Sequence, residues 1–231
     1  MSNTLSALQT QLQQLTKKLA PAANVSSNLL DLDTSNLISS IETALVSLQL
    51  EQLQQQAIAQ QVWDFYPTPQ WVILKMLDFA QITPGLTVLE PSAGLGHICR
   101  EIRQQGVEPD CFEISPLLRQ GLLLQGFNII GEDFLGSTAT AIYDCILANP
   151  PFSRNGIARH TLHALDWLRP GGRLVTLAHH YQLQKSATDR AFFQWLKGFG
   201  ASFHDCGSAF QSAERRCHIP IQIIIVNKPR W

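Results

Sequence analysis

The sequence contains few cysteines, and no two of them stand in the C-x-x-C spacing of redox or zinc sites. The five thiols are odd in number and scattered along the chain, at Cys99, Cys111, Cys145, Cys206 and Cys217. Such an arrangement is typical of structural thiols in a reducing compartment, so we expect a cytoplasmic protein.

Long apolar runs are also missing. No stretch approaches the roughly 20 apolar residues that a membrane-spanning helix needs. The N-terminus lacks the charged and then apolar pattern of a secretory leader. We therefore expect no membrane partner. The 45% hydrophobic content of the 231 residues is enough for one sizeable core.

An excess of basic charge is absent as well. The 17 basic and 18 acidic side chains leave a formal net charge of −1, whereas a stand-alone nucleic-acid binder is normally basic. Local clusters remain candidates for contacts with a nucleic-acid backbone. These are Arg154 with Arg159, and the adjacent pair Arg215-Arg216, and a solvated loop is the alternative for each pair.

Residues 1–60 lack glycine and aromatic residues and contain ten glutamines. Leucines recur at helical spacing over 5–19, Pro21 ends that stripe, and a second apolar stripe runs from Leu37 to Leu48 with Thr34 or Ser35 as its N-cap. We predict a glutamine-rich helical hairpin or arm. Because two short amphipathic helices are unstable alone, they could pack on the main domain, form a homodimer or bind a partner protein.

Residues 61–231 alternate between strand-like and helix-like patterns, which predicts an α/β domain with a mainly parallel sheet and an antiparallel last strand. Trp71, Met76 and Leu77 are expected in the core. The predicted helices cover 95–105, 116–125 and 157–168, and the predicted strands cover 86–90, 108–113, 127–130, 142–148, 172–178, 202–208 and 218–226.

A glycine loop follows the first predicted strand, with the sequence Glu90-Pro91-Ser92-Ala93-Gly94-Leu95-Gly96. Glycines let the backbone turn sharply and come close to a ligand at the carboxyl end of a sheet. Cys99 stands where a dinucleotide fingerprint has its third glycine. The loop therefore favours a nucleotide-sized ligand without a pyrophosphate.

Acidic residues also end the next two predicted strands. Glu113 follows the second strand and could accept hydrogen bonds from both ribose hydroxyls of an adenosine cofactor. Asp133-Phe134 follows the third strand, where the carboxylate could accept the adenine amino group while the ring packs on the base.

The most specific motif is Asn149-Pro150-Pro151-Phe152, directly after the fourth predicted strand. Prolines fix the backbone and leave carbonyl oxygens as acceptors. The Asn149 side-chain carbonyl and the Pro150 backbone carbonyl could hold the two N–H bonds of an aryl amine and aim its lone pair at a methyl donor. Phe152 could stack on the ring of the acceptor.

Together these motifs resemble those of the class I S-adenosylmethionine-dependent amino-methyltransferases, most closely the gamma-type N6-adenine DNA methyltransferases. The resemblance covers roughly residues 62–228. It includes the aromatic T-P segment Phe65-Tyr66-Pro67-Thr68-Pro69, which in that family precedes the first helix and lines the methionine end of the cofactor pocket. The resemblance implies a Rossmann-like class I methyltransferase sheet after the N-terminal helical arm.

The resemblance also implies the site residues. The catalytic turn would be Asn149, Pro150, Pro151 and Phe152. S-adenosylmethionine would contact Tyr66, Thr68, Pro69, Glu90, Ser92, Ala93, Gly94, Gly96, Glu113, Ile114, Asp133 and Phe134. No metal site is expected, because His160 and His163 have no third ligand at useful spacing.

The sequence is compatible with several methyl acceptors. Adenine N6 in DNA is the leading acceptor, and an amino group of an RNA base or the amide of a protein glutamine are alternatives, since the N-P-P-[FY] turn occurs in enzymes of each kind. Nucleic acid is accordingly the expected partner. A cofactor-binding subunit without activity of its own is a further alternative.

Overall fold

The computed structural model describes residues 30–180, 186–212, 215 and 218–230. The chain divides into two compact units, Met1–Leu53 and Gln54–Trp231. Helix α2 (Leu30–Ala59) crosses that boundary. The predicted helix over 5–19 lies outside the described residues.

Helix α2 is longer than predicted. Thr34 and Ser35 were expected to cap it, but they lie inside the helix. The segment contains no proline or glycine that would stop a helix. Hydroxyls in its middle donate to carbonyl oxygens one turn back, as Thr43 Oγ1 does to the Ser39 carbonyl at 2.8 Å, so these side chains do not interrupt the helix.

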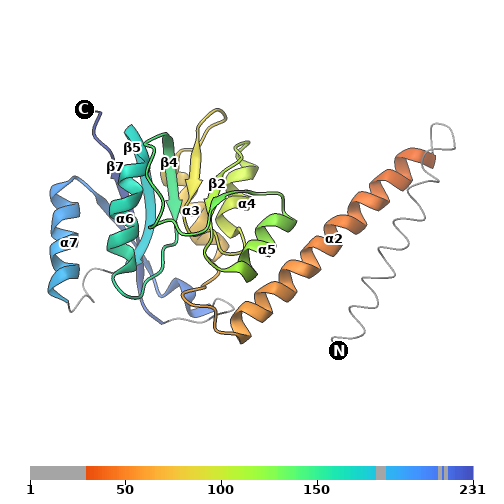
Figure 1. Ribbon diagram of the computed structural model, residues 1–231, viewed down its shortest axis with the longest axis horizontal. Coiled ribbons are helices and arrows are strands. Elements are labelled where there is room, and N and C mark those ends of the chain that lie inside the picture. The colour runs from red at the N-terminus through yellow and green to blue at the C-terminus, as the bar shows by residue number, and fades with distance from the viewer. Residues whose placement is uncertain (1–29, 181–185, 213–214, 216–217, 231) are drawn as a thin grey trace. The chain divides into compact units, whose positions relative to one another are not determined.

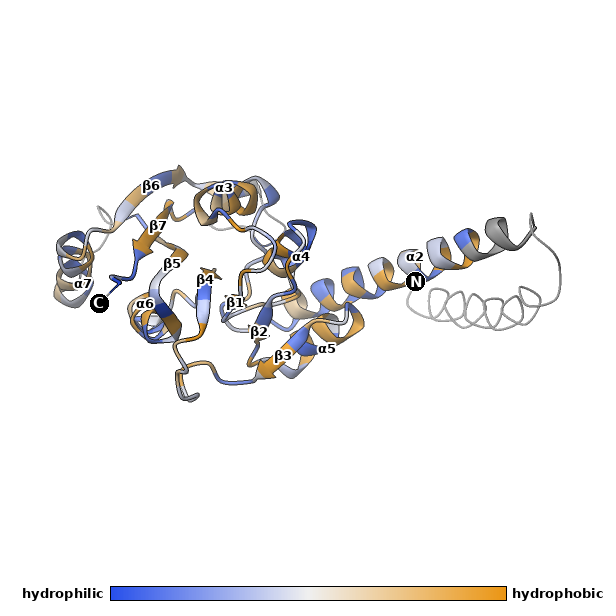
Figure 2. Cartoon of the chain, turned by 90° about the horizontal axis from the view of Figure 1, so that it is seen from above, coloured by the Kyte–Doolittle hydropathy of each residue, from blue (hydrophilic) through white to orange (hydrophobic). Residues whose placement is uncertain are grey.

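The second unit, in which Figure 1 labels β2, β4, β5 and β7, contains a seven-stranded sheet. The strand order is β3-β2-β1-β4-β5-β7-β6 (Figure 2). Strands β1 to β5 pair in parallel, and β7 pairs antiparallel with β5 and β6. This arrangement confirms the predicted fold class. The strands are β1 (Val88–Glu90), β2 (Asp110–Phe112), β3 (Asn128–Gly131), β4 (Tyr143–Ala148), β5 (Leu168–His179), β6 (Ser202–Gly207) and β7 (Ile221–Asn227).

Helices cover both faces of the sheet (Figure 2). Alternate strand residues point to opposite faces, so Cys145 and Leu147 of β4 pack with α3 and α4, whereas Ile146 packs with α6 and α7. The helices are α3 (Gln70–Ala80), α4 (His97–Gln104), α5 (Pro116–Leu124), α6 (Gly156–Trp167) and α7 (Ala187–Gly198). Of these, α4, α5 and α6 match predicted ranges, α3 was implied only as the helix after the T-P segment, and α7 was not predicted.

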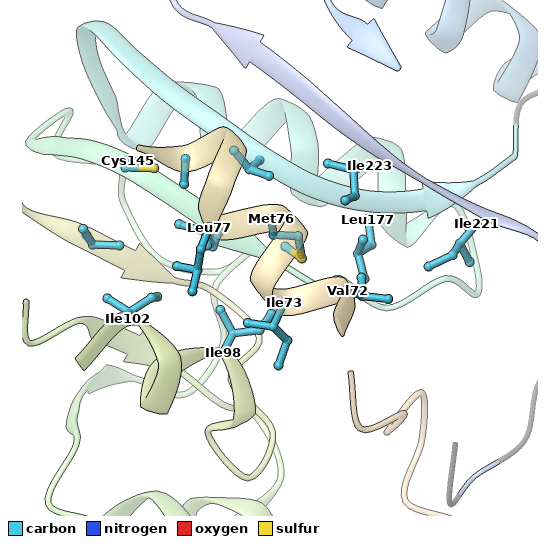
Figure 3. Close-up of a cluster of buried hydrophobic side chains, with 14 of the residues drawn as sticks. Val72, Ile73, Met76, Leu77, Ile98, Ile102, Cys145, Leu177, Ile221 and Ile223 are labelled. Atoms are coloured by element: carbon cyan, nitrogen blue, oxygen red, sulfur yellow. The ribbon is translucent and has the colours of Figure 1, made fainter. Parts of the chain in front are cut away.

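Helix α3 packs on the sheet through one apolar stripe. Val72, Ile73, Met76 and Leu77 are buried against strand residues and against α4 (Figure 3). Trp71 was predicted in the core and is instead 48% exposed, because position 71 precedes this stripe and faces outward. No helix within the described ranges is both long and apolar enough to cross a membrane.

Candidate active site

The carboxyl ends of β1 to β4 meet at one edge of the sheet, and their last side chains surround a cavity of about 390 Å³. This is where parallel α/β sheets bind ligands. Most of the predicted cofactor residues line this first cavity. They are Tyr66, Thr68, Glu90, Ser92, Ala93, Gly94, Glu113, Ile114, Asp133 and Phe134, and Asn149 and Pro151 of the predicted catalytic turn also line it.

Pro69 and Gly96 do not line the first cavity. Each begins a helix beside it instead. The Pro69 carbonyl accepts the N–H of Val72 at 2.9 Å at the start of α3. Gly96 precedes α4 with φ +78°, and a Cβ added there would lie 2.9 Å from the Phe127 ring. Pro69 and Gly96 are therefore the residues at which α3 and α4 begin, and neither is a lining residue of the cavity.

The Glu113 carboxylate is fixed at the edge of the first cavity by two backbone donors. One oxygen accepts the N–H of Gly94 at 2.7 Å, and the other accepts the N–H of Ser115 at 2.8 Å. Burial raises the pKa of Glu113, and these two hydrogen bonds partly offset that effect. The carboxylate is therefore held in one orientation, with remaining acceptor capacity for a ligand.

Glu90 lies deeper in the same cavity. It is 2% exposed, and its carboxylate accepts a hydrogen bond from Cys99 Sγ at 2.7 Å. Burial raises the pKa of Glu90 well above its ordinary value. His97 was not predicted as a site residue, yet it lines the cavity, and burial lowers its pKa to about 4. Its imidazole is therefore neutral at pH 7.

Phe134 forms the aromatic part of the cavity wall. Its ring is buried and lies at centroid distances of 5.9 Å from His160 and 4.7 Å from His163. His160 Nδ1 is 2.8 Å from the Gly156 carbonyl, and His163 accepts a hydrogen bond from Trp167. Both histidines thus pack on the aromatic wall. Where side chains are described, no group of three or more His, Cys, Asp or Glu residues could hold a metal ion.

Asn149 stands at the boundary between the first cavity and a second one. Its Nδ2 donates to the Tyr66 carbonyl at 3.1 Å and to Thr68 Oγ1 at 3.0 Å. These bonds use both hydrogens of the amide nitrogen, so Oδ1 is the atom left to accept a hydrogen bond from a ligand.

The second cavity has a volume of about 250 Å³ and is mainly aromatic and aliphatic. The Phe152 ring contacts His179 edge-on at a centroid distance of 4.7 Å, and Tyr66 contacts Phe210 in the same way at 6.3 Å. Burial lowers the pKa of His179. The lining residues are Asp64, Tyr66, Asn149, Pro150, Phe152, Ser153, His179, Phe210, Ile219 and Ile221. Four of them (Asp64, Tyr66, Asn149 and Ser153) also line the first cavity.

Two contacts that were not predicted join the loops around these cavities. Asp64 Oδ2 accepts a hydrogen bond from Ser153 Oγ at 2.5 Å, which ties the T-P segment to the loop after Phe152. The Arg154 guanidinium lies 4.2 Å from the centre of the Trp63 ring, a cation–π contact. For Trp63, Asp64 and Ser153 the sequence signal was their position beside the T-P and N-P-P-F motifs, whereas Arg154 had been predicted as a candidate for backbone contacts with a nucleic acid.

The arginine clusters divide between two roles. Arg154 and Arg159 line the first cavity, where they remain candidates for phosphate contacts. Arg215 donates instead to the backbone carbonyls of Val62 and Phe65. Arg216 lies outside the described residues.

The sequence matches no protein-family model, and no curated protein is similar to it in sequence. Solved structures are similar in fold. A putative class I S-adenosylmethionine-dependent methyltransferase from Listeria monocytogenes has a TM-score of 0.59 at 13% identity, over 82% of this chain and 68% of that one. A putative RNA methyltransferase from Pyrococcus horikoshii has a TM-score of 0.56 at 15% identity, over 78% and 99%.

A third similar structure is a modification subunit of a putative type I restriction enzyme from Vibrio vulnificus YJ016. It has a TM-score of 0.55 at 16% identity, over 85% of this chain and 52% of that one. At these identities the likeness is one of fold. The chain has the Rossmann-like, mainly parallel sheet of the class I S-adenosylmethionine-dependent methyltransferases, with one antiparallel strand near its edge.

Proposed function

We propose that this chain binds S-adenosylmethionine in the first cavity and methylates an exocyclic amino group held in the second, with adenine N6 in DNA as the leading acceptor. The observation that carries the proposal is the position of Asn149. It lines both cavities, and its amide nitrogen is engaged by Tyr66 and Thr68, so its side-chain oxygen is left for an acceptor.

The first cavity suits the cofactor along its whole length. Glu113 offers carboxylate oxygens to the ribose hydroxyls, and Ile114 and Phe134 offer apolar surfaces to the two faces of adenine. Asp133 can accept the adenine amino group, because its Oδ1 accepts the backbone N–H of Leu135 at 3.1 Å and the carboxylate has further acceptor capacity. The fully buried carboxyl of Glu90 can face the cationic methionine end.

S-adenosylmethionine supplies an electrophilic methyl group on a sulfonium centre. The residues of the chain orient the acceptor amine. Asn149 Oδ1 and the Pro150 carbonyl oxygen accept the two N–H bonds of the acceptor amine, which favours pyramidal nitrogen and directs its lone pair toward the cofactor cavity. Phe152 fixes the plane of the ring, and the apolar wall of the second cavity excludes water. As the new N–C bond forms, the C–S bond would break and its electron pair would stay on sulfur as a neutral thioether. The methylated amine would lose its extra proton to solvent when the product leaves the cavity.

The lining of the second cavity favours a base over a glutamine amide as the acceptor. Tyr66, Phe152 and Phe210 present aromatic surfaces that suit a planar ring. Two of the similar structures are named as an RNA methyltransferase and a restriction-enzyme modification subunit, which agrees with a nucleic-acid partner for this chain. An RNA base is the second candidate acceptor on the same grounds.

The test is methyl transfer from radiolabelled S-adenosylmethionine to unmethylated DNA, total RNA and protein extract in parallel, followed by mass spectrometry of the nucleosides. We expect N6-methyladenine in the DNA. Label in RNA or protein alone would keep the chemistry and replace the acceptor.

Asn149→Ala tests the mechanism. We expect transfer to fall by at least about a hundredfold, since one of two acceptors that orient the amine is removed. Cofactor affinity should change little, measured by calorimetry. Asn36→Ala, at an exposed position of α2, is the matched control. Transfer by Asn149→Ala at the wild-type rate would refute the mechanism.

A further inference from the structure

Arg215 reaches from the loop before β7 to the segment that precedes α3. Its Nη1 donates to the Val62 carbonyl at 2.7 Å and to the Phe65 carbonyl at 2.8 Å. Its guanidinium carbon lies 4.4 Å from the centre of the Tyr66 ring. One half-buried side chain thus holds two carbonyl oxygens and one aromatic ring of a segment about 150 positions earlier in the chain.

The segment held by Arg215 also orients Asn149. The Tyr66 carbonyl accepts one hydrogen of the Asn149 amide, and Thr68 Oγ1 accepts the other. The Phe65 and Tyr66 carbonyls belong to successive peptide units. These units share the Tyr66 Cα, so loss of the Arg215 contact would release the backbone dihedrals that place the Tyr66 carbonyl against Asn149.

The same loop forms part of the second cavity. Phe210, in the short helix η3 (Ala209–Ser212), and Ile219 line that cavity on either side of Arg215 in the sequence. The Phe210 ring also contacts the Tyr66 ring, at a centroid distance of 6.3 Å. Arg215 is therefore the cation that joins the acceptor side of the site to the cofactor side.

The chemistry of these contacts requires arginine. Hydrogen bonds from an ionised donor are shorter and stronger than neutral ones. A planar guanidinium can serve two carbonyls and lie against a ring at once, whereas a lysine ammonium acts as a point charge.

We propose that Arg215 is a positioning residue for methyl transfer, which acts by fixing the Tyr66 peptide and, through it, the side chain of Asn149. The inference rests on the proposed function, because it assigns Arg215 to the orientation of the acceptor amine. It also makes a structural claim about the Asn149 amide that holds whatever the acceptor is.

Kinetics of Arg215→Ala and Arg215→Lys test the role in transfer. We expect kcat to fall about 10- to 100-fold in the alanine variant, because a misplaced orienting group costs about that much. The kcat of the lysine variant should lie between those of the alanine variant and wild type. The Kd for S-adenosylmethionine should change less than threefold in both. Arg230→Ala, outside both cavities, is the control and should match wild type. An unchanged kcat, or equal losses in kcat and in cofactor binding, would overturn the role.

A double-mutant cycle with Thr68→Val separates positioning from general weakening of the fold. Both changes remove support from the same amide, so we expect their effects on kcat to be non-additive by at least threefold. Additive effects would show that Arg215 does not act through Asn149, and would overturn the proposal.

A readout without catalysis keeps this proposal distinct from the proposed function. In ¹⁵N spectra of the full chain, the Asn149 side-chain amide should shift and exchange faster with water in Arg215→Ala but not in Arg230→Ala. If wild type transfers no methyl to any acceptor while this shift appears, the proposed function fails and the link from Arg215 to Asn149 stands. If wild type is active and Asn149→Ala is not, but the amide does not respond to Arg215→Ala, the positioning role fails alone.

Discussion

The Glu90 side chain is buried, and its carboxyl group accepts a hydrogen bond from Cys99 Sγ. Burial raises the pKa of Glu90 well above the ordinary value for glutamate. In the unfolded chain the same group ionises at about pH 4.3. Between these two values the folded state holds more protons than the unfolded state, so stability falls as the pH rises.

The prediction for Glu90 concerns the free energy of unfolding of the ligand-free protein. From pH 5 to pH 7 this free energy should fall in wild type relative to Glu90→Gln, because the unfolded chain releases the Glu90 proton in that range and the folded state holds it more tightly. Urea denaturation at the two pH values measures the difference. An equal pH dependence in both proteins would show that Glu90 ionises in the folded state as easily as in the unfolded chain.

Glu113 should contribute directly to cofactor affinity. In Glu113→Gln an amide nitrogen replaces one carboxylate oxygen and faces the N–H of Gly94 or of Ser115, both of which are donors. We expect the Kd for S-adenosylmethionine to rise about 10- to 100-fold, the loss typical of hydrogen bonds to a charged group.

Calorimetric titration measures the effect of Glu113→Gln on cofactor affinity. Glu108→Gln alters an exposed carboxylate that pairs with Arg103 outside the cavity, so it should bind the cofactor as wild type does. Equal affinities for the two variants would remove Glu113 from the cofactor site.

At the scale of single residues, the motifs predicted groups that follow a strand and missed groups that reach across the fold. Glu113, Asp133 and Asn149 were predicted to lie together because parallel strand ends meet at one edge of a sheet, and all three line the first cavity. The contact of Asp64 with Ser153 and that of Arg215 with Phe65 were not predicted, since the partners stand about 90 and 150 positions apart in the sequence. No local pattern indicates such distant contacts.

At the scale of elements, the start of α4 depends on the absence of a side chain at Gly96. In Gly96→Ala the added Cβ would lie 2.9 Å from the Phe127 ring and 3.0 Å from Leu122, at a φ of +78°. We expect a loss of about 2–5 kcal/mol in the free energy of unfolding, the sum of left-handed strain and overpacking.

Gly126→Ala is the matched control for Gly96→Ala. Its φ is +69°, but an added Cβ would meet no atom within 4 Å. Its free energy of unfolding should therefore fall only by the cost of the left-handed backbone, about 1–2 kcal/mol. Equal losses in the two variants, measured by urea denaturation, would mean that Phe127 and Leu122 move aside without cost.

The strands were easier to predict than two of the helices. Each observed strand overlaps a predicted one. The clearest was β1, a short apolar run between Gly85 and Pro91, whereas β6 (Ser202–Gly207) is not an apolar run.

Helix α7 was missed although Phe192, Trp195, Leu196 and Phe199 stand at the i, i+3, i+4 and i+7 spacing of one helical stripe, and the aromatic rings stack along it. The extent of α2 was missed because its last turns are rich in glutamine, which sustains a helix without forming an apolar stripe.

At the scale of the whole molecule, the second unit contains the complete sheet and both cavities. We predict that a chain of residues 54–231 folds and binds S-adenosylmethionine within about threefold of the affinity of the full chain, since every lining residue is retained. Circular dichroism and calorimetry test this. A loss of cofactor binding with a folded spectrum would assign part of the cofactor site to the first 53 residues.

The shorter chain also tests the predicted role of the N-terminal arm. A smaller oligomer than that of the full chain, measured by sedimentation, would support the homodimer among the alternatives for the arm. Equal oligomeric states with lost transfer to nucleic acid would favour substrate recognition by the arm.

The shared wall of the two cavities has a consequence for inhibitor design. Asp64, Tyr66, Asn149 and Ser153 border both spaces, so a methyl donor in one and an acceptor in the other would lie next to each other. An adenosine joined through a short linker to a planar heterocycle could occupy both cavities as one molecule. Its second half would bind at a high effective concentration, and its affinity would exceed that of either half alone.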